Sequence, residues 1–285
     1  MLDLLRFVFD IVAFTAVMVL IVLGLGVIAS MMGIFNFAHG ELVLLGAYTV
    51  SAVHDAGYSL WLGVLAAPIV VGLFGALLER TVIRRFYASP VIAMLGTYAI
   101  GLIIREIVRG LLGGQFRLVP EPWPGSWSLA GMDFSIWRGF IIVTTLAVIA
   151  GSWLLLTRTA FGLRIRGSLA NPMLARACGI STDKLYAATF AFGAALAGLA
   201  GALVVPLYQL SADMGLRFLV QGFLSVMLGG VGTFEGPILG AAAIGALASG
   251  LPWTVPPVLA DPLVFVIALV IVKFRPQGFI GGARK

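Results

Sequence analysis

The sequence is divided into apolar runs that are too long and too free of charge for the core of a soluble protein. Five of them are wholly or nearly as long as the roughly 20 apolar residues that a membrane helix needs: 11–38, 56–78, 86–104, 139–157 and 185–212. Shorter apolar candidates are 42–53, 218–230, 237–251 and 256–273. With 61% hydrophobic and 11% charged residues, the chain cannot cover itself with a polar surface. We therefore expect an all-α, polytopic transmembrane helical bundle of about 8–9 membrane segments, forming one domain over residues 1–285.

The basic residues indicate which loops face the cytoplasm. Segments 79–90, 157–184 and 273–285 hold twelve of the eighteen Lys and Arg residues, and short cytoplasmic loops are enriched in these residues. Segment 105–138 is nearly balanced in charge and carries Trp123 and Trp127, which is typical of an external loop at a membrane interface. This placement explains the net charge of +6 without a nucleic-acid partner.

The N-terminal topology has two solutions. Arg6 favours a cytoplasmic N-terminus, which makes 35–53 a broken or re-entrant helix. An external N-terminus instead gives nine full crossings. The polar residues Asn36, His39 and Glu41 favour the broken helix, because a plain span would be apolar there. The first apolar run exceeds the length of a signal-peptide core, so we expect an uncleaved first span.

The longest polar interruption on the expected cytoplasmic side, 157–184, contains a short helix with both ends marked. Asn171 is a good N-cap, Pro172 falls at the first helical position, and Gly179 lies where a left-handed C-cap residue belongs. A helix of this length is not stable alone in water. It is either a knob that docks against a soluble partner or a solvated loop with one turn of helix.

Two groups of residues are candidates for the substrate pathway. Asn36, His39 and Glu41 place ionisable groups at membrane depth, which marks either a pathway or a polar plug that ties this segment to a neighbouring helix. Gly232 and Glu235 belong to a glycine-rich segment between two apolar halves, either a tight turn or an unwound junction near the pathway. That segment contains no lysine, so it is not a phosphate-binding loop of the Walker type.

Other charges and motifs argue against chemistry on this chain. Arg105 and Glu106 are adjacent, and we interpret them as a neutral interfacial pair. The sequence has two histidines and one cysteine, so we expect no metal site, no redox motif and no catalytic residue. Zinc-protease, nucleophile-elbow and cofactor fingerprints are absent. The chain is expected to transport rather than catalyse. The alternative is a secondary transporter or channel that uses Glu41, His39 or Glu235 as ion sites; a membrane enzyme ranks third.

Several motifs resemble those of one family. The segment GIFNFAHGE at 33–41 resembles the N-terminal signature of the permease subunits of branched-chain amino acid ABC importers. Residues 162–201, the GGVG and GP motifs at 229–237 and the RPQG motif at 275–278 also match family motifs in the same order. The match spans most of the chain and is closest to the shorter permease type.

The resemblance implies the partners and the energy source. It implies a bacterial inner-membrane protein that works with a second, different permease subunit, two cytoplasmic ATPases and an external solute-binding protein. The chain itself would bind no cofactor, because ATP and Mg belong to the ATPases. The short helix would be the coupling helix in a groove of one ATPase, defined by Asn171, Pro172, Met173, Leu174, Arg176, Ala177 and Gly179. Family members also import urea, short amides or aromatic acids, so the cargo stays open.

Overall fold

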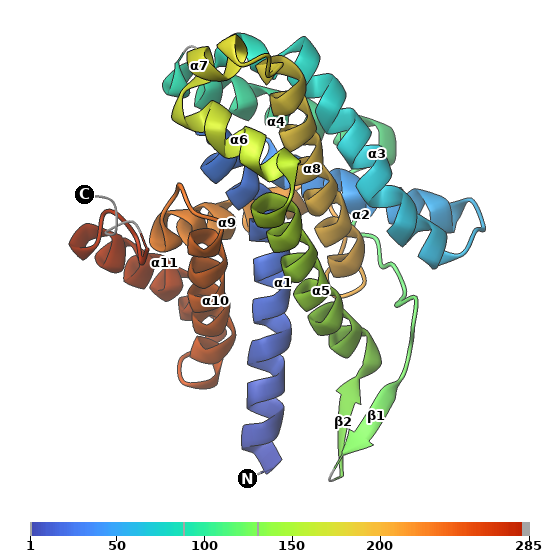
Figure 1. Cartoon of the computed structure of the whole chain (residues 1–285). Coiled ribbons are helices and arrows are strands. Elements are labelled where there is room, and N and C mark those ends of the chain that lie inside the picture. Colours follow the sequence, from blue (N-terminus) through green and yellow to red (C-terminus); the bar gives the residue numbers. More distant parts are fainter. Residues whose placement is uncertain (1, 88, 130, 281–285) are drawn as a thin grey trace.

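The computed structural model in Figure 1 describes residues 2–87, 89–129 and 131–280. Its α-helices in chain order are α1 (Leu2–Met32), α2 (His39–Asp55), α3 (Leu60–Thr81), α4 (Pro90–Leu112), α5 (Ile136–Arg158), α6 (Ala160–Ala170), α7 (Pro172–Ala177), α8 (Thr182–Val204), α9 (Met214–Gly229), α10 (Glu235–Gly250) and α11 (Pro257–Phe274). Short 3-10 turns are η1 (Ile83–Phe86) and η2 (Leu251–Trp253), and one antiparallel hairpin joins β1 (Ser126–Leu129) to β2 (Met132–Ser135).

The five long apolar runs are confirmed as helices of membrane-spanning length, but the expected count of about 8–9 membrane segments is not reached among the described residues. In the described part of the chain, six helices are long and apolar enough to cross a membrane: α1, α3, α4, α5, α8 and α10 with η2. Each apolar run of the sequence coincides with a helix, and the shorter runs correspond to α2, α9, α10 and α11. The protein is therefore an all-α, polytopic membrane protein. The hairpin and α6 were not predicted from the sequence.

The helices form a buried centre and an exposed periphery. The apolar windows of α1 and α8 are 78% and 72% buried, whereas those of α3, α4 and α5 are between 22% and 33% buried. All five have the hydropathy of a membrane span whether they are buried or exposed, because lipid is as apolar as a protein core. Helix α8 packs against α1, α2 and α3, and α1 also packs against α10.

Small residues set the distance between the central helices. Gly46 of α2 meets the backbone of Gly198 in α8, and a Cβ on Gly201 would run into the carbonyl oxygen of Val43. Gly193 approaches α1 at Gly24 in the same way. The small-residue stripe of α8 is therefore a packing surface, because no larger side chain fits between these backbones.

The N-terminus lies at the same end of the bundle as the hairpin, and α7 lies at the opposite end (Figure 1). Asp10 of α1 forms an ion pair with Arg138 at 2.6 Å, and the rings of Phe9 and Phe134 are 4.9 Å apart. If segment 105–138 is external, the N-terminus is external too. On that condition the terminus lies on the side that the second N-terminal alternative gives it, whereas the helix break at 33–38 is the feature that the first alternative predicts.

Candidate functional site

The break between α1 and α2 is held by hydrogen bonds to its own backbone. The Asn36 side-chain oxygen accepts from the backbone N–H of Ala38 at 3.0 Å, and Thr97 Oγ1 on α4 accepts from the backbone N–H of Phe37 at 3.0 Å. Gly33 begins the break at a φ of 70°, in the left-handed region that favours glycine. Asn36 is completely buried, so these bonds satisfy backbone groups that water cannot reach.

His39 joins the start of α2 to the middle of α1. Its Nε2 lies 3.0 Å from the carbonyl oxygen of Ile21, and its side chain is 1% exposed. Ile21 lies in the middle of α1, so this hydrogen bond contacts the backbone of a central helix. His39 thereby fixes where α2 starts relative to α1.

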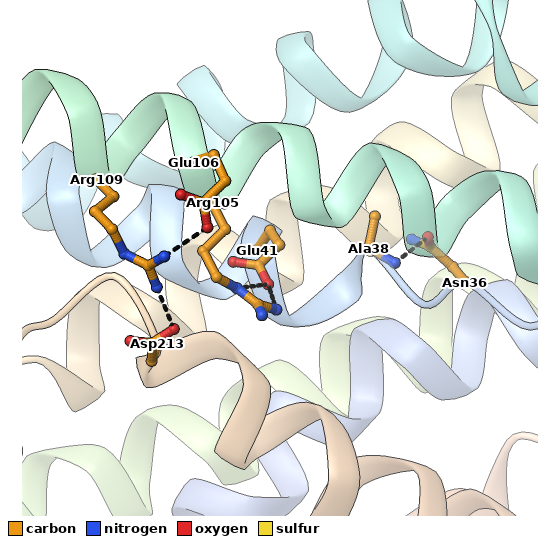
Figure 2. A network of polar contacts seen from close by, with 7 residues as sticks. All are labelled: Asn36, Ala38, Glu41, Arg105, Glu106, Arg109 and Asp213. Atoms are coloured by element: carbon orange, nitrogen blue, oxygen red, sulfur yellow. Dashed lines mark hydrogen bonds and ion pairs between the residues drawn. The ribbon is translucent and has the colours of Figure 1, made fainter.

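Glu41 forms an ion pair with Arg105 of α4 (Figure 2). The guanidinium donates to Glu41 Oε1 through both Nε, at 3.0 Å, and Nη2. Glu41 is completely buried and Arg105 is 8% exposed. Opposite charges taken out of water must pair with good geometry, and here each finds its partner on another helix. The expected pairing of Arg105 with Glu106 is wrong, because neighbours in a helix point in different directions.

Glu106 instead belongs to a second, more exposed pair of contacts. Arg109 donates to Glu106 at 2.5 Å within α4 and to Asp213, just before α9, at 2.6 Å (Figure 2). Asp213 is 64% exposed in its side chain and Arg109 is 39% exposed. The charges at the start of α2, on α4 and before α9 therefore link three helices.

The predicted helix in segment 157–184 is confirmed as α7. The Asn171 side-chain oxygen accepts from the Leu174 N–H at 3.0 Å, as an N-cap does. At the other end, Gly179 has φ of 79° and donates to the Arg176 carbonyl, while Ile180 donates to the Ala175 carbonyl. These two bonds form a Schellman motif.

The body of α7 turns its apolar side chains outward. Met173 is 82% exposed and Leu174 is 60% exposed, whereas Ala175 is buried against the rest of the protein. Pro172, Arg176 and Ala177 are also exposed, and the Arg176 Nε donates to Thr182 Oγ1 at 2.9 Å. The structure thus places all seven sequence-predicted coupling residues within one capped turn at the end of the bundle opposite the hairpin (Figure 1).

Gly232 and Glu235 belong to the turn beside the end of α1 that carries Ser30 and leads into the break. The Gly232 N–H donates to Ser30 Oγ at 3.3 Å, and Glu235 is exposed at the first position of α10. The C-terminal segment covers this turn, because Phe279 donates to the Leu228 carbonyl at 2.9 Å. The structure does not bring this pair together with Asn36, His39 and Glu41.

Sequence reasoning missed two features of these regions. Arg105 was assigned the wrong partner, and Glu79, which lies in the basic segment 79–90, was not assigned a role. Glu79 is 1% exposed and accepts from the Tyr87 hydroxyl at 2.7 Å. Among the residues that the structure describes, no three His, Cys, Asp or Glu side chains gather as a metal site would require.

The fold and the buried charge pair define a polytopic helical membrane protein whose polar residues are organised between helices. The model of the family described as branched-chain amino acid transport system / permease component matches residues 7–272. The chain belongs to this family, as its motifs indicated. It is a multi-pass protein of the inner membrane and a permease subunit.

Relatives of known name agree over most of the chain. The high-affinity branched-chain amino acid transport system permease protein BraD of Pseudomonas aeruginosa is 26% identical, over 92% of this chain and 91% of its own length. A probable branched-chain amino acid transport permease protein LivH of Methanocaldococcus jannaschii is 30% identical, over 82% and 76%. The galactofuranose transporter permease protein YtfT of Escherichia coli is 25% identical, over 95% and 80%.

One solved structure has the same fold. A chain of PsaBC from Streptococcus pneumoniae, solved in complex with Fab, gives a TM-score of 0.50 at 14% identity, covering 97% of this chain and 92% of that one. At this identity the likeness concerns the fold alone. It supports a bundle of the kind that Figure 1 shows.

Proposed function

We propose that this chain is the membrane-spanning permease subunit of an ABC importer for branched-chain amino acids. An external solute-binding protein delivers the cargo, a second permease completes the pathway, and two cytoplasmic ATPases that bind ATP and Mg drive the cycle. Family membership supports the transport role. The proposed cargo follows the names of the relatives BraD and LivH, which are described as branched-chain amino acid transport permease proteins.

The observation that carries the proposal is the exposed apolar surface of α7. A helix of six residues has no stability of its own, yet this one is capped at both ends and presents Met173 and Leu174 outward. Two large apolar side chains on a basic, polar segment gain stability only when a partner covers them. An ATPase groove is the partner that the family supplies.

The remaining residues of α7 and its caps either belong to the proposed contact surface or define the ends of the helix. Arg176 and Ala177 are exposed beside Leu174 and belong to the proposed contact surface. Asn171, Pro172 and Gly179 set where the helix begins and ends. Closure of the ATPases would push α7, and the push would reach α8 through the Arg176–Thr182 hydrogen bond.

The proposed pathway passes the break at 33–38. Asn36, His39 and Glu41 keep the break in position through bonds to its backbone, to α1 and to α4. Gly232 and Glu235 are proposed to lie at the inner end of the same route, beside the last turn of α1. The side chains at the break thus shape the pathway, and the cargo passes a wall that they hold.

The test is uptake by the reconstituted machine. Proteoliposomes that contain this chain, the second permease and the ATPases, with the binding protein outside, should accumulate radiolabelled leucine, isoleucine or valine only with ATP. Urea, acetamide and benzoate serve as competing cargoes. Preferred uptake of one of these would reassign the cargo. Movement of solute by this chain alone, without nucleotide, would reject the importer.

A further inference from the structure

A cavity of about 590 Å³ lies behind α7, at the end of the bundle with the basic loops. Its walls come from the end of α1, the end of α3, the segment around η1, and the facing sides of α7 and α8. Its volume falls within the range of about 300–1,000 Å³ that small-molecule sites occupy. It is distinct from the outward surface of Met173 and Leu174, which line no part of it.

Charges of both signs line this inner cavity without pairing to one another. The acids are Glu79 and Asp183, and the bases are Arg84, Arg85 and Arg176. Across residues 2–87, 89–129 and 131–280, no carboxylate of the cavity lies within 4.0 Å of one of these guanidinium groups. The opposite charges therefore face a shared space, and each favours a ligand group of the other sign.

Glu79 supplies the most specific feature of the cavity. Its side chain is 1% exposed, and one oxygen accepts from the Tyr87 hydroxyl at 2.7 Å. The other oxygen has no hydrogen-bond partner in the described protein. Burial raises the pKa of Tyr87, so this hydroxyl remains a donor at neutral pH. A buried carboxylate oxygen without a partner is costly, and an ammonium group would satisfy it.

Apart from Tyr186, the rest of the lining is apolar. Met32 and Ile34 come from the end of α1 and the start of the break, and Pro172 comes from α7. A ligand that fits this lining has an ammonium group, a carboxylate and an apolar side chain. We propose that the inner cavity binds an apolar amino acid as a zwitterion from the cytoplasmic side. This rests on the proposed function, because amino acids would be delivered to that side by the importer.

An amino acid bound in the inner cavity would restrict the movement of the coupling helix α7. The cavity is walled by Pro172 and Arg176 on α7 and by Glu79 on α3, so a bound amino acid connects the two helices. Because the ligand would contact α7 on the side that faces the cavity, α7 would move less when the ATPases close. The site therefore makes the imported product an inhibitor of its own import.

Binding is measured on the assembled complex in nanodiscs without the binding protein. Radiolabelled leucine should bind saturably, and 4-methylpentanoate and 3-methylbutylamine, which lack one charge each, should compete poorly. Glu79→Gln keeps the acceptor for Tyr87 but loses the charge, and it should weaken leucine binding by about tenfold or more. Glu106→Gln removes an exposed acid on α4 and should change nothing.

The second readout is ATP turnover stimulated by the leucine-loaded binding protein. Leucine added beyond saturation of the binding protein should lower turnover in the unsubstituted complex and leave it unchanged with Glu79→Gln. Absence of saturable binding, equal binding by Glu79→Gln, or full competition by either single-charge analogue would overturn the cavity proposal. Failure of ATP-driven leucine uptake would instead reject the proposed function, because the binding measurement requires no transport.

Discussion

The two charged regions of this bundle are built in opposite ways. At the start of α2, Glu41 is buried and forms an ion pair with the buried Arg105 of α4. At the inner end, Glu79 and Asp183 face three arginines across a cavity without forming ion pairs among the described residues. Nearby, Met173 and Leu174 point outward. The charges of the first region pair with each other through Glu41 Oε1, although Glu41 Oε2 has no hydrogen-bond partner among the described residues, whereas the charges of the second region do not pair with one another.

This difference separates what each region can contribute. A buried ion pair between two helices fixes how those helices are arranged, and its loss should appear in the stability of the isolated subunit. Exposed apolar residues contribute little to folding alone, so their loss should appear only when partners are present. The following variants test whether the two regions differ in this way.

The largest effect is expected at α7. The double substitution Met173→Asp and Leu174→Asp places two charges where we propose that an ATPase docks, and should reduce both leucine uptake and stimulated ATP turnover by about tenfold or more. Both side chains are exposed, so the unfolding transition of the isolated subunit should not change. Leu118→Asp, an equally exposed position in segment 105–138, is the control. Normal uptake by the double variant would show that α7 is not the coupling helix.

At the Glu41–Arg105 pair, we expect a substitution to lower the stability of the isolated subunit. Glu41→Ala leaves Arg105 buried without a partner and should lower the free energy of unfolding by about 3–5 kcal/mol. Adding Arg105→Leu removes the stranded charge and should recover a large part of that loss. Tryptophan fluorescence during denaturant titration of the subunit in detergent measures both. If the double variant is no more stable than Glu41→Ala, the pair does not act as a unit.

The sequence predicted the spans and the caps of α7 because both signals are local. Hydropathy over about 20 residues marks a membrane helix, and Asn171, Pro172 and Gly179 mark the ends of α7 within one short segment. The Glu41–Arg105 pair was missed because its members are 64 positions apart and only packing brings α2 to α4. The inner cavity was missed for the same reason, since its lining comes from separate segments.

The sequence also did not predict which helices are buried at the centre of the bundle and which lie at its periphery. Helices α1 and α3 are both apolar over most of their length, but α1 is mostly buried and α3 mostly faces outward. In a soluble protein, the polar face of a helix would reveal its orientation. In lipid that signal is lost, and small residues such as Gly198 and Gly201 of α8 mark the packed surface instead.

A smaller effect is expected where backbones touch. A Cβ on Gly201 meets the carbonyl oxygen of Val43, so Gly201→Ala should lower the free energy of unfolding by about 1–3 kcal/mol. Gly151→Ala is the matched control, because a Cβ there has open space inside α5 and should raise stability by up to about 1 kcal/mol. Equal responses in the same denaturant titration would mean that the contact between α8 and α2 is loose.

The smallest effect is expected at the exposed edge of the charge network. Asp213 pairs with Arg109, but its side chain is 64% exposed, so solvent screens the interaction. Asp213→Asn should therefore change the free energy of unfolding by about 1 kcal/mol or less, and the change should shrink further at high salt. This variant and Glu41→Ala remove the same kind of group from arginines one turn apart on α4. If both substitutions lower the free energy of unfolding by the same amount, burial does not determine how much each ion pair contributes. The ion pairs of Figure 2 would then act as one cooperative network.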